Sequence, residues 1–217
     1  DRLVAQLAER LLAVGSRCIC VQPGPRFHRK AADHFEVGVT VCADWQRLEQ
    51  QLATESAGPC AGVVYLLGLD AQEGKDSSIG EFGHTVDAGC VGLLSWLQAH
   101  SQRAAANLGS GKSRVLVVTR AARAVVACEP TQPLQAMLWG FSGVIASEHP
   151  ELQVQRIDLD GTTATTPSAM AAVLYEELAS NDPEHTIAWR GSVRYAARLI
   201  PCSPDEPALV PAVAVRR

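Results

Sequence analysis

The sequence predicts an α/β fold with a doubly wound, mostly parallel sheet that helices cover on both faces. Continuous apolar runs at 62–67, 114–119 and 154–159 are typical of buried parallel strands. The longer stretches between them carry apolar residues at helical spacing. Strands that alternate with helices form a parallel sheet, because each helix returns the chain across the sheet.

The chain opens on a predicted helix rather than on a strand. The residues that predict this helix are Leu3, Leu7, Leu11 and Val14, with Gly15 as its C-terminal cap. A doubly wound domain normally opens with a strand and a Gly-rich turn, and the helix that follows holds a phosphate at its N-terminus. We therefore expect the first strand and turn to be absent or to lie outside the sequence given.

The next elements are shorter. Strands are predicted at 18–21 and 37–41, with a polar, basic loop at 23–33 between them. Asp44 is the predicted N-cap of a helix whose apolar face carries Trp45, Leu48 and Leu52. The stretch 71–82 is rich in Gly, Ser and Asp, which predicts a loop. A long helix follows, and the residues on its apolar face are Val86, Cys90, Leu93, Leu94 and Leu97.

The last third of the chain continues the alternation. A helix is predicted at 133–148, and Pro167 opens another, whose apolar residues are Met170, Val173, Leu174 and Leu178. Two short apolar segments at 186–189 and 193–199 predict a hairpin or two linked short strands. The tail from 201 onward is rich in Pro, Ala and Val without a helical period, which is typical of a linker.

Composition and charge exclude several classes of partner. The chain has 217 residues, of which 47% are hydrophobic and 19% charged, and its formal net charge is −4. This charge favours neither nucleic acid nor an anionic membrane as a partner. No apolar run approaches the roughly 20 residues that span a bilayer, and the amphipathic start lacks the apolar centre of a signal peptide. We therefore expect a cytoplasmic protein.

The cysteines predict reduced thiols rather than disulfides. Their number, seven, is odd, and no C-x-x-C pair occurs. Cys18, Cys20, Cys60 and Cys90 lie in or beside apolar segments, where we expect buried thiols.

The segment 138–150 carries the residue types of a serine hydrolase without their geometry. Ser142 lies between glycines, His149 follows it, and Asp158 and Asp160 come shortly after. A nucleophile elbow needs G-x-S-x-G on a strand-to-helix turn, whereas the letters here are GFSG within a helical pattern. Seven residues of helix would separate Ser142 from the region of His149 by roughly 10 Å, far more than a hydrogen bond spans.

Two stripes of a packed helix account for the same letters better. The apolar stripe consists of Met137, Phe141, Val144 and Ile145. The small-residue stripe, which would allow close approach to a sheet, consists of Gly140, Gly143 and Ser147. Pro150 ends the helix because it disfavours helical backbone at the preceding residue.

The sequence also lacks a convincing motif for binding a nucleotide or a metal ion. LGSGKS at 108–113 would need a glycine at Ala106 to match a phosphate loop, and it follows a helix and precedes a strand, the reverse of the required order. No G-x-G-x-x-G follows any predicted strand, and neither a Tyr-x-x-x-Lys nor a Tyr-x-x-x-Asn pair occurs. The six histidines show no metal-ligand spacing.

Two charged groups remain as candidates. A basic cluster in the predicted loop consists of Arg26, His28, Arg29 and Lys30, and we interpret it as solvated surface rather than a phosphate site. Around the loop at 71–82 lie four residues that could line a cleft, although their spacing specifies no reaction: Asp76, Glu81, His84 and Asp87.

Five segments, in order along the chain, resemble the ketoreductase domains of modular polyketide synthases. LWGFSGVIASEHPE at 138–151 is similar to the LWGLGRVIALEHPEL helix of that family, and RIDLD at 156–160 to a strand ending in IDLD. VVTRAARAV at 117–125 resembles VTRGAQAV, GVVYLLGLD at 62–70 resembles GVVHLWALD, and VRYAARL at 193–199 resembles RYVARL. Phe and Ser at 141–142 depart from the family's Leu-Gly.

The resemblance implies that residues 1–200 form the N-terminal structural subdomain of a ketoreductase, without the family's opening strand, and that 201–217 form a linker to the next domain. The fold it implies is a truncated Rossmann-like one, of the short-chain dehydrogenase/reductase type. In that family the N-terminal half holds no cofactor, while the C-terminal half binds NADPH and carries the Ser/Tyr/Lys/Asn machinery. The resemblance therefore implies no catalytic, cofactor-binding or metal-binding residue in this chain.

The expected function is structural, within a multifunctional synthase. The implied partners are the catalytic half, which reduces a β-ketoacyl group on a phosphopantetheine arm, and the neighbouring dehydratase, enoylreductase and acyl carrier protein domains. Two alternatives stay open. A free-standing α/β reductase or hydrolase would have its site near 69–87, with His84 and Asp87 as candidate residues. A nucleotide- or acyl-binding module would hold a ligand at the crevice of the sheet.

Overall fold

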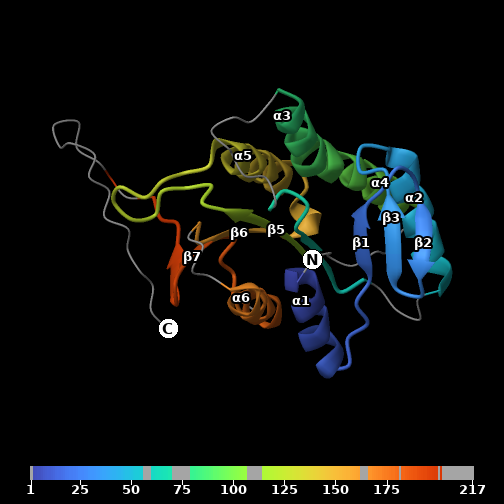
Figure 1. Cartoon of the computed structure of the whole chain (residues 1–217), viewed down its shortest axis with the longest axis horizontal. Coiled ribbons are helices and arrows are strands. Elements are labelled where there is room, and N and C mark those ends of the chain that lie inside the picture. Colours follow the sequence, from blue (N-terminus) through green and yellow to red (C-terminus); the bar gives the residue numbers. More distant parts are fainter. Residues whose placement is uncertain are drawn as a thin grey trace.

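Two sheets form the centre of the computed structural model, which describes residues 2–55, 60–69, 79–106, 114–161, 166–180, 182–199 and 201 (Figure 1). The larger sheet has the order β4-β5-β6-β7-β8, and its strands are Gly62–Tyr65, Arg114–Arg120, Val154–Leu159, Thr186–Arg190 and Val193–Ala196. Strands β4 to β7 are parallel, and β8 is antiparallel to β7. The smaller sheet has the order β1-β3-β2, with strands Cys20–Pro23, His34–Val37 and His28–Ala31.

Helices cover both faces, which confirms the predicted layered architecture. One layer contains α2 (Cys42–Glu55), α3 (Ile79–Val86), α4 (Gly92–Ala106) and α5 (Pro133–Glu148). The other contains α1 (Arg2–Ala13) and α6 (Pro167–Ala179). Strand β5 lies between the layers, so Val115 and Val117 pack toward the first layer while Leu116 and Val118 pack toward the second. This alternation follows from the two-residue period of a strand that is buried on both faces.

Several elements were predicted with their correct bounds or nearly so. Helix α5 and strand β6 occupy the predicted residues, and β7 and β8 form the predicted hairpin. Gly15 follows α1 with a φ of 80°, in the left-handed region that favours glycine at a helix C-terminus. The strand predicted at 62–67 ends earlier, at Tyr65. The predicted linker lies outside the described residues apart from Pro201.

The predictions around the smaller sheet were less accurate. The strand predicted at 37–41 is wrong, because β3 ends at Val37 and the chain turns there, with Val41 N–H donating to Gly38 O at 2.8 Å. The basic loop at 23–33 contains β2, an exposed strand with no apolar alternation to reveal it. Asp44 is not an N-cap: it lies within α2, and its carboxylate accepts the N–H of Gly38 at 2.9 Å.

The long helix after residue 79 is interrupted by a π-helical turn, Asp87–Val91, which joins α3 to α4. The cause lies in Tyr65 of β4, whose hydroxyl donates to Ala88 O at 2.5 Å and lies 3.1 Å from Gly89 O. The predicted apolar face of this helix is only partly buried. Leu93 is buried, whereas Leu94 is 39% exposed on the outer side of the helix layer.

The six described cysteines are free thiols, as predicted, but they are less buried than expected. Cys18, Cys20 and Cys90 are half-buried and Cys60 is exposed. Burial, with a further contribution from Cys20, raises the pKa of Cys18 to about 11, so this thiol stays protonated near neutral pH. Among the described helices, none combines the length and apolar character needed to cross a bilayer.

Candidate functional site

Asp158 occupies the carboxyl end of β6, close to where open α/β sheets bind their ligands. Its carboxylate is fully buried and is bound by the chain itself. Thr119 Oγ1 donates to it at 2.7 Å, the N–H of Ala122 at 2.8 Å, and Nη2 of Arg190 at 2.8 Å. Asp158 therefore joins the ends of three neighbouring strands rather than facing an open crevice.

Arg190, at the end of β7, extends this network into the connection after β5. Its Nε donates to Glu129, and its Nη2 donates to Arg123 O at 2.8 Å. Glu129 Oε2 in turn accepts the N–H of Val125 at 2.8 Å. The connection is thus fixed in place by two buried carboxylates and one guanidinium.

Gln135 closes the carboxyl ends of β4 and β5. Its Nε2 donates to Gly68 O at 2.5 Å, and its Oε1 accepts the N–H of Arg120 at 3.2 Å. Leu138, one turn further along α5, lies so near Gly68 that a side-chain Cβ there would come within 2.6 Å of it. The carboxyl ends of β4 to β7 are therefore filled by side chains of the chain itself.

The structure does not bring the hydrolase candidates together. Ser142 is fully buried within α5 and donates to Trp139 O at 2.9 Å. His149 lies beyond the end of α5, where its Nδ1 is 3.0 Å from Glu151 Oε1. This position is at the amino end of β6, whereas Asp158 is at the carboxyl end of that strand. Asp160 accepts the N–H of Gly191 at 3.2 Å.

The other candidates are surface residues or lie outside the described part. His84 and Asp87 are both exposed on α3 and the π turn. Asp76, the side chain of Glu81 and the LGSGKS segment at 108–113 lie outside the described residues. No cluster of His, Cys, Asp and Glu within the described part could hold a metal ion.

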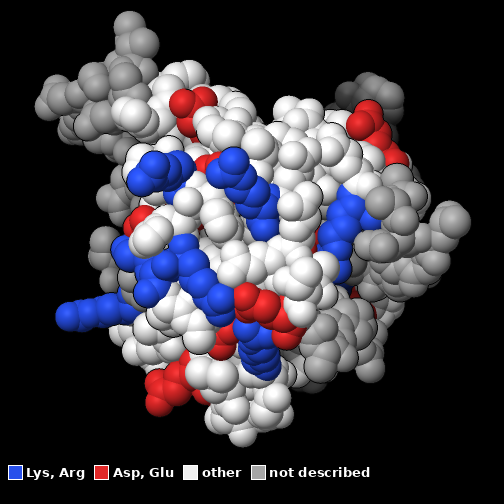
Figure 2. All heavy atoms as spheres, turned by 90° about the vertical axis from the view of Figure 1, so that its right-hand side faces the viewer, with Lys and Arg blue, Asp and Glu red and all other residues white. Residues whose placement is uncertain are grey.

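Two members of the basic cluster, Arg29 and Lys30 of β2, form ion pairs with nearby carboxylates. Arg29 pairs with Glu55 at 2.7 Å, and Lys30 pairs with Glu36 at 2.8 Å. Figure 2 shows this side of the molecule, where Lys and Arg side chains lie beside Asp and Glu rather than in one basic field. The interpretation of the cluster as solvated surface agrees with this arrangement.

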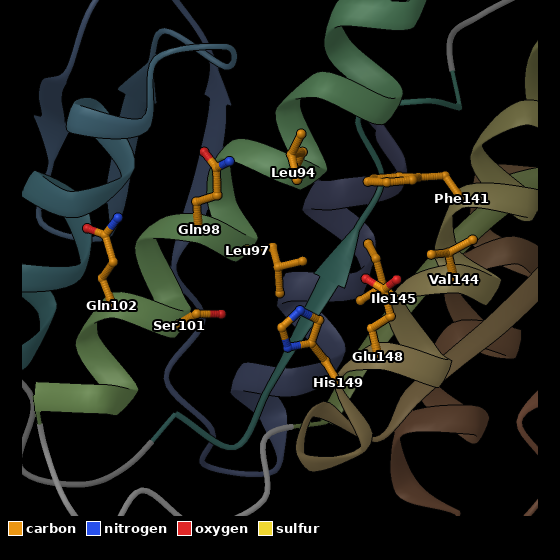
Figure 3. A pocket seen from close by; sticks show the side chains of 10 residues that line it. All are labelled: Leu94, Leu97, Gln98, Ser101, Gln102, Phe141, Val144, Ile145, Glu148 and His149. Carbon is orange, nitrogen blue, oxygen red and sulfur yellow. The ribbon is translucent and has the colours of Figure 1, made fainter.

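A groove lies between α4 and α5 on the described surface. Its volume is about 370 Å³. One part of the wall is apolar and consists of Leu94, Leu97, Phe141, Val144 and Ile145. The polar part consists of Gln98, Ser101, Gln102, Glu148 and His149. In Figure 3, Leu94 and Phe141 face one another at one end of the groove, while His149 lies at the other.

Other exposed apolar side chains lie on α3 and α5, in the same helix layer. Phe82 is 50% exposed, Val144 49% and Met137 36%. Together with Leu94 and Phe141 we call these residues the α4/α5 face. Exposed apolar groups that gather around a groove, rather than lying singly, mark a surface that another molecule covers. The face is therefore a candidate docking site.

The predicted stripes of α5 were assigned to the wrong sides. Of the apolar stripe only Ile145 is buried, while Met137, Phe141 and Val144 belong to the α4/α5 face. In the small-residue stripe Gly140 has nothing near the position of a Cβ, so it makes no close contact with the sheet. The sheet is instead contacted by a third set of residues, and its members are Leu134, Leu138, Trp139, Ser142 and Ile145.

Sequence reasoning missed Arg190, Glu129 and Gln135, the partners that close the carboxyl ends of the strands. The position of Arg190 at the end of a strand was a possible signal in the sequence. Its partner Glu129 could not be identified, because it lies 61 positions away along the chain. The α4/α5 face had a clearer signal, since α5 is apolar on two sides. A helix that is apolar on two sides normally packs against other elements on both of those sides.

Comparison with known proteins identifies the relatives of the chain. The family model for the polyketide synthase extender module SpnB, Rossmann fold domain, matches residues 20–199. The mycocerosic acid synthase-like polyketide synthase of Mycolicibacterium smegmatis is 31% identical over 173 residues, which cover 78% of this chain and 7% of that protein. A phenolphthiocerol/phthiocerol polyketide synthase protein of Mycobacterium tuberculosis is 31% identical over 150 residues, which cover 67% of this chain and 8% of that protein.

Two solved ketoreductases show a similar structure. The first ketoreductase of the tylosin polyketide synthase superposes with a TM-score of 0.59 at 28% identity, over 90% of this chain and 35% of that one. An N-terminal ketoreductase from the macrolactin assembly line has a TM-score of 0.67 at 16% identity, over 93% of this chain and 39% of that one. The second likeness concerns the fold alone.

Proposed function

Because the chain belongs to the Rossmann-fold domain family of the polyketide synthase extender module SpnB, we propose that it is the structural, non-catalytic half of a ketoreductase. Its role is to hold in place, by packing, the NADPH-dependent half that reduces β-ketoacyl groups on an acyl carrier protein. The observation that carries the proposal is the α4/α5 face, where Val144 is 49% exposed and Leu94 39%. Covering these side chains would contribute about 25 cal/mol for each Å² of apolar surface removed from water.

The occupant of the face is the remainder of the ketoreductase. This chain covers 35% and 39% of the two solved ketoreductase chains, so more than half of each lies outside the similar region. That remainder is large enough to form a second domain. It is also joined covalently to the first, which raises the effective concentration of the two surfaces for one another.

The closed carboxyl ends of the strands support a non-catalytic role. A dinucleotide bound there would have to separate Arg190 from Asp158 and Glu129, whose side chains are all at most 10% exposed. Breaking a buried ion pair by removing one partner costs on the order of 3–5 kcal/mol. This chain would therefore supply a packing surface, and its partner half would bind the cofactor.

The cofactor part of the proposal is tested by calorimetric titration of the purified chain with NADPH. We expect no heat of binding at concentrations up to about 1 mM, which corresponds to a binding free energy weaker than about −4 kcal/mol. Micromolar binding that disappears in His84→Ala or Asp87→Ala would overturn the proposal in favour of a free-standing reductase with its site near 69–87.

The docking part is tested with a matched pair of substitutions. Val144→Glu places a charge on the α4/α5 face, whereas Val14→Glu places the same charge at a position that is 59% exposed on the far helix layer. We expect Val144→Glu to weaken association with the separately produced catalytic half by about tenfold or more, because a carboxylate must lose its hydration there. Equal affinities of the two variants would contradict docking at this face.

A further inference from the structure

Arg156 of β6 is half-buried, and within the described part of the chain no carboxylate pairs with it. Its Nη2 donates to Thr186 Oγ1 at 2.7 Å, and its guanidinium carbon lies over the ring of Trp139, 5.1 Å from the ring centroid. Burial, with a further contribution from the charge of Arg123, lowers the pKa of Arg156. Other arginines do pair with carboxylates, and they are Arg17, Arg29, Arg103, Arg190, Arg194 and Arg198. The charge of Arg156 is therefore left without a counter-ion.

Arg123 places a second guanidinium near the first. It is exposed in the connection after β5, and its backbone N–H lies 3.4 Å from Asp158 Oδ2. Asp158 follows Arg156 by two residues on β6, so the two side chains lie on the same face of the sheet. The described residues supply no carboxylate to the Arg123 side chain either. Two guanidinium groups near one another with no acidic partner form a surface that favours a carboxylate.

Helix α5 leaves this surface accessible, because its neighbouring side carries little side-chain bulk. A Cβ at Gly143 would lie 2.8 Å from Arg156 Nη1, so the guanidinium fits against α5 only with glycine there. At Gly140, which is exposed, a Cβ would meet nothing within 4 Å. Another segment of chain can therefore approach α5 closely beside Arg156.

The chain leaves the sheet near this surface. Arg156 of β6 lies opposite Thr186 of β7. On the other side of β7, the N–H of Ala197 donates to Thr186 O at 3.1 Å. Ala197 is thus two strand spacings away from Arg156, which is about 10 Å.

The segment that follows carries the complementary charge. Residues 202–217 lie outside the described part, and their acidic residues are the adjacent pair Asp205 and Glu206. Asp205 is eight positions beyond Ala197, and eight extended residues span up to roughly 26 Å. This length is more than enough to bring the acidic pair to Arg156.

We propose that Arg156 and Arg123 bind the carboxylates of Asp205 and Glu206, so that the segment after β8 is held against the glycine-bearing side of α5. A guanidinium can bind a carboxylate through two parallel N–H···O bonds, which fixes the position of the segment as well as balancing the charge. The inference does not rest on the ketoreductase proposal, because it concerns only groups of this chain.

A double-mutant cycle on the full chain tests the proposal. One pair of substitutions is Asp205→Asn with Glu206→Gln, and the other is Arg156→Gln with Arg123→Gln. We expect neutralisation of the acidic pair to lower the folding equilibrium constant about threefold or more, measured by urea denaturation at low salt. In the chain that carries both arginine substitutions the same change should have almost no effect. In the control background Arg26→Gln, an exposed arginine of the smaller-sheet side, the full effect should remain.

The side-chain N–H signals of Arg156 in an NMR spectrum give a second measurement that needs no arginine substitution. We expect the Nε–H signal to shift when Asp205 and Glu206 are neutralised. An unchanged signal together with unchanged stability would overturn the proposal. So would an equal loss of stability with and without the two arginines, because the acidic pair would then act elsewhere. A signal that moves on addition of sulfate but not on neutralisation of the pair would assign the site to a free oxyanion instead.

Discussion

Asp158 accepts four hydrogen bonds although its side chain is fully buried. Three come from Thr119, Ala122 and Arg190 at 2.7 to 2.8 Å, and a longer one comes from Arg123 N–H at 3.4 Å. The ionised carboxylate is matched to this set of donors, one of which is a guanidinium. The residue therefore stabilises the ends of the strands rather than a substrate.

Replacing this carboxylate by an amide tests its role. In Asp158→Asn the shape of the side chain is kept, but Arg190 loses one of its two buried counter-ions, the one at 2.8 Å, and keeps only Glu129. We expect a loss of about 3–5 kcal/mol in the free energy of unfolding, measured by urea denaturation. Asp160→Asn is the control, since Asp160 is only half-buried, and it should cost about 1 kcal/mol or less. Similar losses for both variants would show that the network contributes little.

Glu49 gives the chain a defined pH dependence. It joins α2 to α4, with Oε1 at 3.3 Å from His100 Nδ1 and Oε2 at 2.5 Å from Arg103 Nη1. Burial alone would raise the pKa of Glu49, but the hydrogen bonds and charges of His100 and Arg103 outweigh it and lower the pKa below 4.5. A carboxyl with a lowered pKa stabilises the folded state above its unfolded pKa and loses this effect as the pH falls through its folded pKa.

Glu49→Gln should therefore be less stable than the unmodified chain at pH 7, by about 1 kcal/mol. The difference should shrink as the pH falls below 4.5, where Glu49 is protonated first in the unfolded chain and, at lower pH, in the folded chain as well. Urea denaturation from pH 7 to pH 3 measures this, and Glu9→Gln on the exposed side of α1 is the control. A difference that stays constant over this range would assign the effect to packing instead of charge.

Helix α5 shows what a sequence pattern can and cannot predict at the level of an element. Its bounds and its stop before Pro150 follow from local chemistry, and both were predicted. Its orientation was not, because a helix that is apolar on two sides has no single face that must point inward. Strand β2 could not be predicted at all from its side chains. It is held by hydrogen bonds to β3, and its exposed residues show no apolar alternation.

Two glycines of α5 allow the effect of helix propensity on stability to be measured apart from the effect of steric contact. A Cβ at Gly140 would meet nothing within 4 Å, whereas a Cβ at Gly143 would lie 2.8 Å from Arg156 Nη1. That guanidinium is held by Thr186 at 2.7 Å and lies over the ring of Trp139. We expect Gly140→Ala to raise the free energy of unfolding by about 0.5–1 kcal/mol.

Gly143→Ala should show a smaller gain or a loss, because Arg156 must move away from Thr186 or Trp139 to admit the methyl group. Thermal and urea denaturation of the two variants side by side provide the measurement. A larger gain at Gly143 than at Gly140 would mean that Arg156 is not held as the structure has it.

For the whole molecule, the alternation of strands and helices was enough to predict the layers and the mostly parallel sheet. The closure of the strand ends could not be predicted in the same way. Arg190 meets Asp158 and Glu129 from 32 and 61 positions away, and only the complete fold brings them together. The α4/α5 face could not be predicted either, because Leu94 belongs to the predicted apolar face of its helix and is nevertheless 39% exposed.

The difference in burial between the sheets predicts how the chain opens. Strands β5 and β6 are buried on both faces, whereas every residue of β2 and the last two residues of β1 are exposed. We expect hydrogen exchange to be slowest in β5 and β6, intermediate in β3 with its buried Phe35, and fastest in β1 and β2. The rates should differ by tenfold or more between β5 and β2, since a local opening of β2 exposes almost no apolar surface. Exchange as slow in β2 as in β5 would mean that the smaller sheet opens only when the whole molecule unfolds.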